Sequence, residues 1–510
     1  MTAEPPSPVD HPPARAGRRE WAGLALLTLP LFVLALDASV LFLAAPHIGA
    51  DLAPDANQWL WIMDVYGFMI AGFLITMGAV GDRIGRRRLL LLGSAAFALA
   101  SLWAALADSP IALIAARAVL GVAGATLMPS TLALIRTMFR DDRQRTTAVA
   151  VWMTTFSVGV ALGPLIGGAL LEVLPWGSVF LLALPAMVPV VLLGRMLLPE
   201  SRDPAPARTD LPGAALSVIA MISLVYGLKE LVAQGPEPAG AIALLLGLAA
   251  GTVFVRRLRR VPAPLVDPAL FASRALRTAL VLLLLGVFSA TAVNFLVPSF
   301  LQASAGAGPL VAGLLTAPVA VAAIGGSLAA PAMAGRWGPL PVIAGGAVLS
   351  LAGHLVLAQA AAGGPVWALV AGGALAVLGV SPTTVLGTDL VVSSAPEERA
   401  GSAAALSETG GELGVALGIA VMGGLASAVY RFRVESLLPA EVDPATAAAV
   451  AENAVSAERA VSGLPPDTAG AVLTAAGEAF ASGVSAAGYA CAAVALLLAG
   501  LAVRSARTRR

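Results

Sequence analysis

Residues 59–91 read WLWIMDVYGFMIAGFLITMGAVGDRIGRRRLLL. This stretch begins as an apolar run of about twenty residues, which is long enough to cross a bilayer as one helix. It then passes through a short segment with four arginines, and a second apolar run follows at once. The strands of a membrane barrel would instead alternate apolar and polar residues over about ten positions. The stretch therefore predicts two membrane-spanning helices joined by a tight, basic loop.

The composition of the whole chain indicates that lipid surrounds most of it. Of the 510 residues, 58% are apolar and 12% are charged, whereas a soluble globular domain carries about 25% charged residues. We therefore expect an all-α polytopic membrane protein. Fourteen apolar runs are long enough to span a bilayer, at 22–46, 57–80, 89–107, 110–135, 146–171, 177–198, 211–232, 239–255, 275–301, 309–334, 340–361, 365–392, 400–429 and 481–503.

The positions of the arginines indicate how these runs are oriented. Cytoplasmic loops of membrane proteins carry an excess of Arg and Lys. Arginines precede the first run, follow the last and occur in every second loop, whereas the other loops hold only Lys229, Arg431, Arg433 and Arg459. The alternation predicts an even number of spans and places both termini in the cytoplasm of a bacterial inner membrane.

Two similar segments indicate an internal repeat. GAVGDRIGRRRLLLLG (78–93) follows the second run, and PAMAGRWGPLPVIAGG (331–346) joins the tenth run to the eleventh. Transporters often consist of such repeats, with the substrate site between the two halves. We expect a disordered tail at 1–20, a six-helix bundle at 21–200, an inserted helix pair at 201–262, a second six-helix bundle at 263–503 with an outer loop at 430–480, and a tail at 504–510.

The loop after the second run has a specific pattern. Gly85 permits a tight turn, and Asp82 can form charge-assisted hydrogen bonds with its neighbours, although arginines alone could serve only as cytoplasmic anchors. The pattern Gly-x-x-x-Asp-Arg-x-Gly-Arg-Arg resembles the signature loop of the major facilitator superfamily. That resemblance implies an inner latch between the bundles, formed by Asp82 and Arg83. The matching residues are Gly78, Asp82, Arg83, Gly85, Arg86 and Arg87.

The fifth run carries a second pattern. Gly159, Gly163 and Gly167 recur every four residues, which makes one flat face for close helix packing, and Pro164 removes a backbone donor and favours a bend. A seam of small residues is also common in any membrane bundle. The string from Gly159 through Gly168 to Leu170 resembles the antiporter motif of drug/proton exchangers. The resemblance implies export and argues against uptake.

Few ionisable residues lie inside the apolar runs, and the candidates are Asp37, Asp64, Arg117, Glu408 and Glu412. An ionisable group at mid-bilayer costs at least about 2.5 kcal/mol, so it usually faces a cavity and has a function. Glu408 and Glu412 are four residues apart and therefore share a helix face. Asp64 could instead lie at a wetted outer interface, and Arg117 could instead neutralise Asp37.

A carboxylate in a low-dielectric cavity binds a proton more readily than one in water, and it also attracts a cationic ligand. Proton and cation would then compete for one group, which is the simplest physical basis for exchange. Trp59, Trp61, Tyr66 and Trp152 could add cation–π contacts to a flat cation. Trp and Tyr at span ends are also common interface anchors.

The chain as a whole resembles the fourteen-helix drug/proton antiporters of the major facilitator superfamily, and within them the quaternary-ammonium multidrug efflux branch. The resemblance implies the major facilitator fold, cation binding and proton coupling at Asp37, Asp64, Glu408 and Glu412, and proton relay at Arg117. The matching strings are LDASVLFLAAP (36–46), residues 59–91, RAVLGVAGATLMPSTLALIR (117–136), the fifth-run motif and SETGGELG (407–414).

Two departures limit what the resemblance implies. Leu120 stands where the family usually has Gln, which makes the relay role of Arg117 less certain, and the run at 309–334 has no acidic residue, which favours monovalent cations. The alternatives are a proton-coupled exporter of one endogenous natural product or antibiotic and, with less support, a solute-uptake symporter. A channel would need a re-entrant pore loop or a charged ring.

The sequence does not favour an enzyme. It has no phosphate-binding loop and no metal-ligand cluster, and its histidines are His11, His47 and His354. We therefore expect neither a cofactor nor a metal. The expected partners are lipophilic cationic small molecules, protons and the lipid bilayer, with no nucleic acid, and we expect a monomer.

Overall fold

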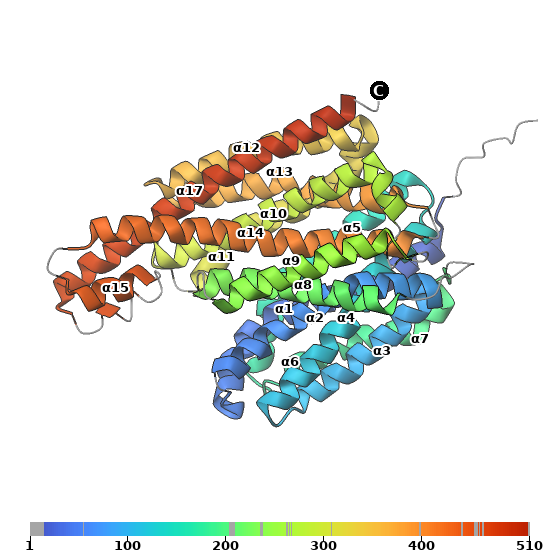
Figure 1. Ribbon diagram of the computed structural model, residues 1–510, viewed down its shortest axis with the longest axis horizontal. Helices are drawn as coiled ribbons and strands as arrows, with labels where there is room; N and C mark the ends of the chain where they lie inside the picture. The colour runs from blue at the N-terminus through green and yellow to red at the C-terminus, as the bar shows by residue number, and fades with distance from the viewer. Residues whose placement is uncertain are drawn as a thin grey trace, which may run out of the picture.

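The computed structural model consists of helices and short connections throughout the part of the chain that it describes (Figure 1). It describes residues 15–507 except 55, 203–209, 235–237, 262–263, 265, 267, 308, 397–398, 440–441, 453–456, 458–459 and 462–463. Most of the tail expected at 1–20 lies outside the described residues, and the first helix begins at Arg18.

The first bundle contains the helices that precede the inserted pair. Gly85 separates its second and third helices with a φ of 106°, a left-handed value that glycine adopts without strain. Ser109 accepts a hydrogen bond from the backbone nitrogen of Ala112 and so caps the fourth helix. The helices are α1 (Arg18–Leu52), α2 (Ala56–Ile84), α3 (Arg86–Ala105), α4 (Pro110–Met138), α5 (Asp142–Leu171), α6 (Ser178–Leu181) and α7 (Leu184–Leu197).

The inserted pair and the second bundle complete the chain. The inserted pair is α8 (Leu211–Gln234) and α9 (Pro238–Leu258). The second bundle follows the short 3-10 helix η1 (Pro268–Ala272) and contains α10 (Arg274–Ala303), α11 (Pro309–Trp337), α12 (Pro339–Ala361), α13 (Val366–Ser393), α14 (Ala400–Leu437) and α17 (Pro466–Arg507), with the shorter α15 (Pro444–Glu452) between the last two.

Thirteen segments among the described residues are long and apolar enough to cross a membrane, with α6 and α7 together forming one of them. This confirms the predicted all-α membrane fold. The expected count of fourteen is not reached by this measure, because α5 does not qualify within its described residues. It is nevertheless a continuous helix of 30 residues.

The bundles meet along two seams. In one seam, α8 packs against α2 of the first bundle and α14 of the second, so the inserted pair covers this side of the junction. In the other seam, α5 packs against α11 and α13. Figure 1 shows the two bundles converging toward the end where the C-terminus lies and fanning apart toward the opposite end.

The segment expected as an outer loop at 430–480 contains helices. α14 and α17 run far beyond the expected spans, and α15 packs beside them at one extremity (Figure 1). Tyr430, Val434, Val450 and Val472 are buried together there. The hydroxyl of Tyr430 donates a hydrogen bond to the backbone oxygen of Val450 at 2.7 Å. This extremity therefore has a small core of its own.

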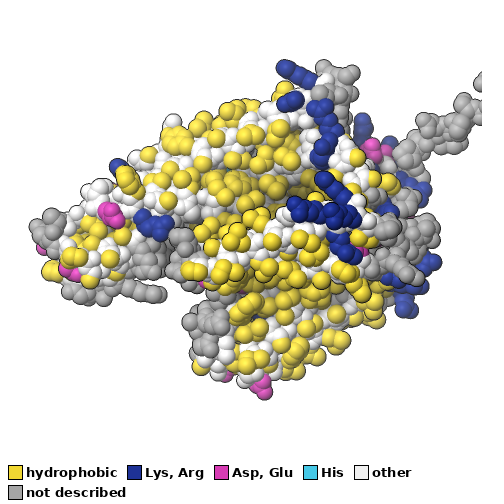
Figure 2. Space-filling view, in the orientation of Figure 1, with side chains coloured by type: hydrophobic (Ala, Val, Ile, Leu, Met, Phe, Trp, Pro, Cys, Tyr) yellow, Lys and Arg dark blue, Asp and Glu magenta, His cyan; other side chains and the backbone are white. Residues whose placement is uncertain are grey.

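Arginines gather at the opposite end of the molecule, which we call the arginine-rich end. They occupy the last turns of α2, α4, α7, α9, α11 and α17. Figure 2 shows most of the visible Lys and Arg side chains at this end, beside a flank that is almost wholly apolar. The distribution fits a molecule whose apolar flank faces lipid and whose basic end faces water.

Candidate functional site

Two of the predicted charges form an ion pair inside the first bundle. Arg117 on α4 and Asp37 on α1 lie 3.5 Å apart, measured from guanidinium Nη1 to carboxylate Oδ2. The Arg117 side chain is 2% exposed and that of Asp37 is 10% exposed. The Arg117 guanidinium also lies over the ring of Tyr66 on α2, 5.2 Å from its centroid. We call Asp37, Arg117 and Tyr66 the buried triad.

A close helix contact positions this triad. A Cβ built on Gly121 of α4 would lie 2.5 Å from the backbone oxygen of Tyr66, so only glycine allows α4 to approach α2 so closely. One turn earlier on α4, Arg117 is therefore held against the Tyr66 ring. Among the described residues, the Tyr66 hydroxyl and the Nε of Arg117 have no hydrogen-bond partner. An unpaired buried polar group costs about 1–3 kcal/mol, so such groups usually have a functional reason.

The second bundle adds two carboxylates to the same region. Glu408 and Glu412 lie one turn apart on α14, which packs against both α2 and α4. Glu412 interacts electrostatically with Tyr66, as Asp37 and Arg117 also do, and it interacts with Glu408 as well. Tyr66 is therefore within electrostatic range of acids from both bundles, Asp37 on α1 and Glu412 on α14. Asp37, Arg117 and Glu412 therefore share one region, and Glu408 lies one turn from Glu412.

The fifth residue, Asp64, lies on a different face of α2. It is three residues after Trp61 and four before Phe68, so it shares their helix face. Trp61 stacks on Tyr226 of α8, with centroids 6.5 Å apart and ring planes at 9°, and Phe68 meets Tyr226 edge to face at 5.9 Å. Asp64 is thus turned toward the inserted pair, and Tyr226 is an aromatic neighbour that sequence reasoning missed.

The aromatic residues proposed for cation–π contacts have different positions. Trp152 is 1% exposed, and its Nε1 donates to Thr131 Oγ1 at 3.1 Å, so it joins α5 to α4 inside the first bundle. Trp152, which the sequence offered as one possible cation–π contact, therefore belongs to the core of the first bundle. The side chain of Trp59 lies outside the described part of the chain. Trp61 and Tyr66 remain as candidates.

The predicted loop residues tie several helices together at the arginine-rich end. Asp82 pairs with Arg86 at 2.7 Å. It also accepts hydrogen bonds from the backbone nitrogen and hydroxyl of Ser402, at 3.0 and 2.7 Å, at the start of α14. Asp82 thus joins the first bundle to the second. Arg86 itself donates to the hydroxyl of Ser201 at 2.8 Å.

Other residues of this loop pack against the end of α7. The backbone nitrogen of Arg87 donates to Glu200 Oε1 at 3.1 Å, and its side chain donates to the backbone oxygen of Leu198 at 3.0 Å. A Cβ on Gly85 would lie 2.5 Å from Glu200 Oε1, the end of a flexible side chain, so this turn requires glycine for its φ rather than for space. Gly78 is buried within α2. Arg83 lies in the last turn of α2.

Two further junctions between the bundles were not predicted. Asp389 on α13 accepts hydrogen bonds from Arg145 Nε at 2.8 Å and from Thr146 Oγ1 at 2.9 Å, both on α5. Arg136, at the end of α4, donates to the backbone oxygens of Val392 and Ala395 at the end of α13. The sequence indicated only that Asp389 lies near a span end.

The glycine motif of α5 packs against α1. A Cβ on Gly159 would lie 2.7 Å from the Cβ of Ala35, and one on Gly167 would lie 2.7 Å from a methyl of Val40. Gly163 is buried. The side-chain surroundings of Pro164 and Gly168 fall outside the description. The flat face therefore serves helix packing beside Asp37.

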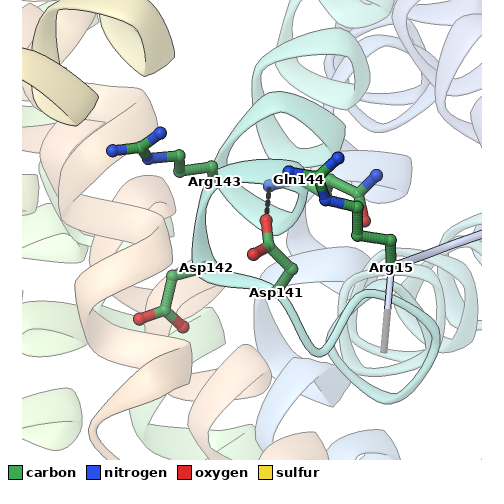
Figure 3. A pocket seen from close by; sticks show the side chains of 5 residues that line it. All are labelled: Arg15, Asp141, Asp142, Arg143 and Gln144. Atoms are coloured by element: carbon green, nitrogen blue, oxygen red, sulfur yellow. Dashed lines mark hydrogen bonds between the residues drawn. The ribbon is translucent and has the colours of Figure 1, made fainter. Parts of the chain in front are cut away.

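A separate hollow of about 480 Å³ lies at the arginine-rich end, lined by Arg15 and by residues 141–144 (Figure 3). The backbone nitrogen of Gln144 donates to Asp141 Oδ1 at 2.9 Å. Two acids and two arginines line this hollow, and residues 142–144 belong to the first turn of α5. It is distinct from the buried triad.

Comparisons with known proteins identify relatives. The model of the Major Facilitator Superfamily matches residues 27–419. The "Multidrug efflux pump LfrA" of Mycolicibacterium smegmatis is 40% identical over 97% of this chain and 98% of its own. The "Methyl viologen resistance protein SmvA" of Salmonella typhimurium is 35% identical over 91% of this chain and 93% of its own.

One further relative and one solved structure are also similar to this chain. The "Tetracenomycin C resistance and export protein" of Streptomyces glaucescens is 33% identical over 98% of this chain and 95% of its own. Among solved structures, the human organic anion transporter MFSD10 matches with a TM-score of 0.63 and 17% identity, over 95% of this chain and 99% of that one. This last similarity concerns the fold alone.

Proposed function

Because the chain belongs to the Major Facilitator Superfamily, we propose that it is a proton-coupled antiporter that exports lipophilic, mainly monovalent organic cations by alternating access. Its relatives include multidrug and antibiotic efflux pumps, which supports export of drug-like molecules. The sequence has no phosphate-binding loop with which the protein could use ATP. We therefore take a proton gradient as the energy source.

One observation carries the proposal. Tyr66 lies within electrostatic range of Asp37 and Arg117 from the first bundle and of Glu412 from the second, and Glu408 lies one turn from Glu412 on the same helix. A site shared between bundles changes its surroundings whenever the bundles rock against each other. A carboxylate that binds a proton in one state and a cation in the other then couples the two fluxes.

The chain's own residues suggest how the exchange proceeds. Arg117 neutralises Asp37, so the first bundle presents little net charge at the site. Glu408 and Glu412 repel each other when both are ionised, and this repulsion is relieved when either a proton or a cation arrives. Arrival of one therefore weakens binding of the other, as antiport requires. The Tyr66 hydroxyl is within electrostatic range of Asp37 and Glu412, and in this proposal it can pass or hold a proton.

We also propose that the structure is open to the outside. The junctions made by Asp82, Arg136 and Asp389 all lie at the arginine-rich end, which the positive-inside rule assigns to the cytoplasm together with both termini. The bundles fan apart at the other end (Figure 1). Passage of cargo from the cytoplasm then requires these three junctions to break.

The remaining assignments belong to the same proposal. We assign α5 as the fourteenth span, since its 30 residues reach about 45 Å at 1.5 Å per residue. We place the chain in the quaternary-ammonium branch because its relative SmvA is named for resistance to methyl viologen, which is a quaternary cation. That molecule carries two positive charges, so it also tests the preference for monovalent cations.

The alternative is a dedicated exporter of one natural product. The relative named for export of tetracenomycin C favours it. The range of cargo separates the two proposals. A multidrug pump protects a sensitive host from several unrelated cations, whereas a dedicated exporter protects it from one compound only.

The direct experiment uses inside-out vesicles that contain the protein and an imposed proton gradient. Ethidium should accumulate in them and leave when a protonophore collapses the gradient, and methyl viologen should be taken up less well. Glu408→Gln and Asp37→Asn should each abolish accumulation at unchanged expression. Accumulation that resists the protonophore, or that persists in both variants, contradicts the proposal.

A further inference from the structure

The seam between α5 and α11 contains a groove that the proposed transport cycle does not use. It lies at the arginine-rich end, has a volume of about 500 Å³ and takes its walls from both bundles. The residues that matter for its chemistry are Arg143, Thr147 and Val151 of α5 and Leu328, Pro331 and Arg336 of α11.

The mouth of the groove is strongly basic. Arg143 and Arg336 line it, and the described lining includes no acid. A Cβ built on Gly335 would lie 3.8 Å from the Nε of Arg143, so this arginine reaches across the seam to the residue beside Arg336. The guanidinium of Arg336 lies 5.6 Å from the ring centroid of Trp337, which is 57% exposed.

The nearest acids of α5 do not neutralise Arg143. Asp142 pairs with Arg145 at 2.9 Å, and Asp141 accepts from the backbone of Gln144. Figure 3 shows Arg143 pointing away from both carboxylates. Two arginines from different bundles therefore face one opening, and like charges at such proximity favour an anion between them.

Below the arginines the groove is apolar. Val151 follows Arg143 by eight residues and Leu328 precedes Arg336 by eight, so each lies about 12 Å further along its helix at 1.5 Å per residue. Leu328 is 50% exposed. Only 22% of the most apolar stretch of α11 is buried inside the protein. The groove therefore opens toward lipid, with charge at one end and hydrocarbon-like walls below.

We propose that this groove binds one anionic phospholipid of the inner leaflet, with its phosphate between Arg143 and Arg336 and an acyl chain along Val151 and Leu328. Guanidinium groups match phosphate oxygens in pairs, and basic pockets between spans on the cytoplasmic side hold anionic headgroups. Because the two arginines belong to different bundles, the lipid bridges them only while the arginine-rich ends are together. It therefore stabilises that state over the one open to the cytoplasm.

The test is lipid binding to the purified full-length chain by native mass spectrometry, with short-chain phosphatidylglycerol and phosphatidylcholine as probes. The variant Arg143→Gln/Arg336→Gln removes both groove arginines. Arg195→Gln/Arg504→Gln removes two exposed arginines from last turns elsewhere at the same end and serves as the matched control.

We expect wild type and control to bind one phosphatidylglycerol tightly and the groove variant to bind it roughly thirtyfold more weakly. A Leu328→Gln variant, which keeps both arginines, should also bind less tightly. Equal binding by the groove variant and the control overturns the proposal. So does equal binding of phosphatidylcholine, and so does displacement of the lipid by millimolar inorganic phosphate, which would show a site for free anions.

Discussion

Asp389 of α13 accepts a hydrogen bond from the Nε of Arg145 of α5 at 2.8 Å, so a carboxylate of one bundle holds a guanidinium of the other. The same Arg145 pairs with Asp142 on its own helix at 2.9 Å. The Asp389 side chain is 11% exposed and that of Asp142 is 86% exposed. Arg145 therefore forms one buried ion pair between the bundles and one exposed ion pair within α5.

This contrast predicts different effects for two similar substitutions. Asp389→Asn should destabilise the protein, because breaking one partner of a buried pair costs about 3–5 kcal/mol. It should also favour the state open to the cytoplasm. Asp142→Asn should change stability by at most about 1 kcal/mol, as exposed pairs contribute little. Thermal unfolding in detergent compares them, and equal losses for the two variants would contradict an inter-bundle role for Asp389.

Tyr66 gives a second prediction, which separates stability from transport. Tyr66→Phe keeps the ring under the Arg117 guanidinium and removes only a buried hydroxyl for which the described residues offer no partner. Stability should stay within about 1 kcal/mol of wild type, while ethidium efflux should fall by about tenfold or more if the hydroxyl moves a proton. Normal efflux by Tyr66→Phe would remove the hydroxyl from the mechanism.

The aromatic contact between Trp61 and Tyr226 predicts a role for the inserted pair in cargo preference. Tyr226→Ala should lower efflux of flat aromatic cations more than efflux of tetraalkylammonium ions, because stacking and cation–π contacts contribute about 0.5–2 kcal/mol. Tyr226→Phe keeps the stacked ring and is the matched control. Inhibitory concentrations in a pump-deleted host measure both, and a uniform loss for all cations would indicate a purely structural role.

The lowered pKa of Asp210 leads us to expect that the stability of the inserted pair depends on pH. Hydrogen bonds from Arg257 at 2.9 and 3.0 Å, and one from the backbone of Gly213, hold the pKa of Asp210 below its ordinary value of 3.8. A carboxylate whose folded-state pKa is depressed stabilises the fold above its unfolded pKa, and this contribution is lost as the pH falls through the folded value. Wild type should therefore lose stability more steeply than Asp210→Asn below about pH 4. Parallel pH profiles of unfolding temperature would exclude this linkage.

Part of this site could be predicted because its signals are local or rare. Charges inside apolar runs are few, so Asp37, Arg117, Glu408 and Glu412 stand out, and the structure brings Asp37, Arg117 and Glu412 within range of Tyr66. Asp82 lies in a loop whose spacing is specific, and it contacts the start of α14 while its ion-pair partner is Arg86. In each case a single residue type in an unusual place carried the prediction.

Other features depend on how distant helices dock, which spacing along the chain does not encode. Asp389 and Arg145 are 244 positions apart, and each alone resembles an ordinary residue at a span end. The direction in which Asp64 faces depends on where the inserted pair packs. The burial of Trp152 could not be foreseen, because a tryptophan inside a span can fill the core as well as contact a ligand.

The central claim is that proton and cation compete for the carboxylates beside Tyr66, and proton release on binding tests it most directly. Tetraphenylphosphonium is added to purified protein in weakly buffered detergent solution, and the pH change is recorded with a dye. Wild type should release protons in a saturable manner that follows binding. Glu408→Gln/Glu412→Gln should release none, whereas Glu435→Gln, on the distant outer part of α14, should behave as wild type. Saturable binding by wild type without proton release would contradict the account.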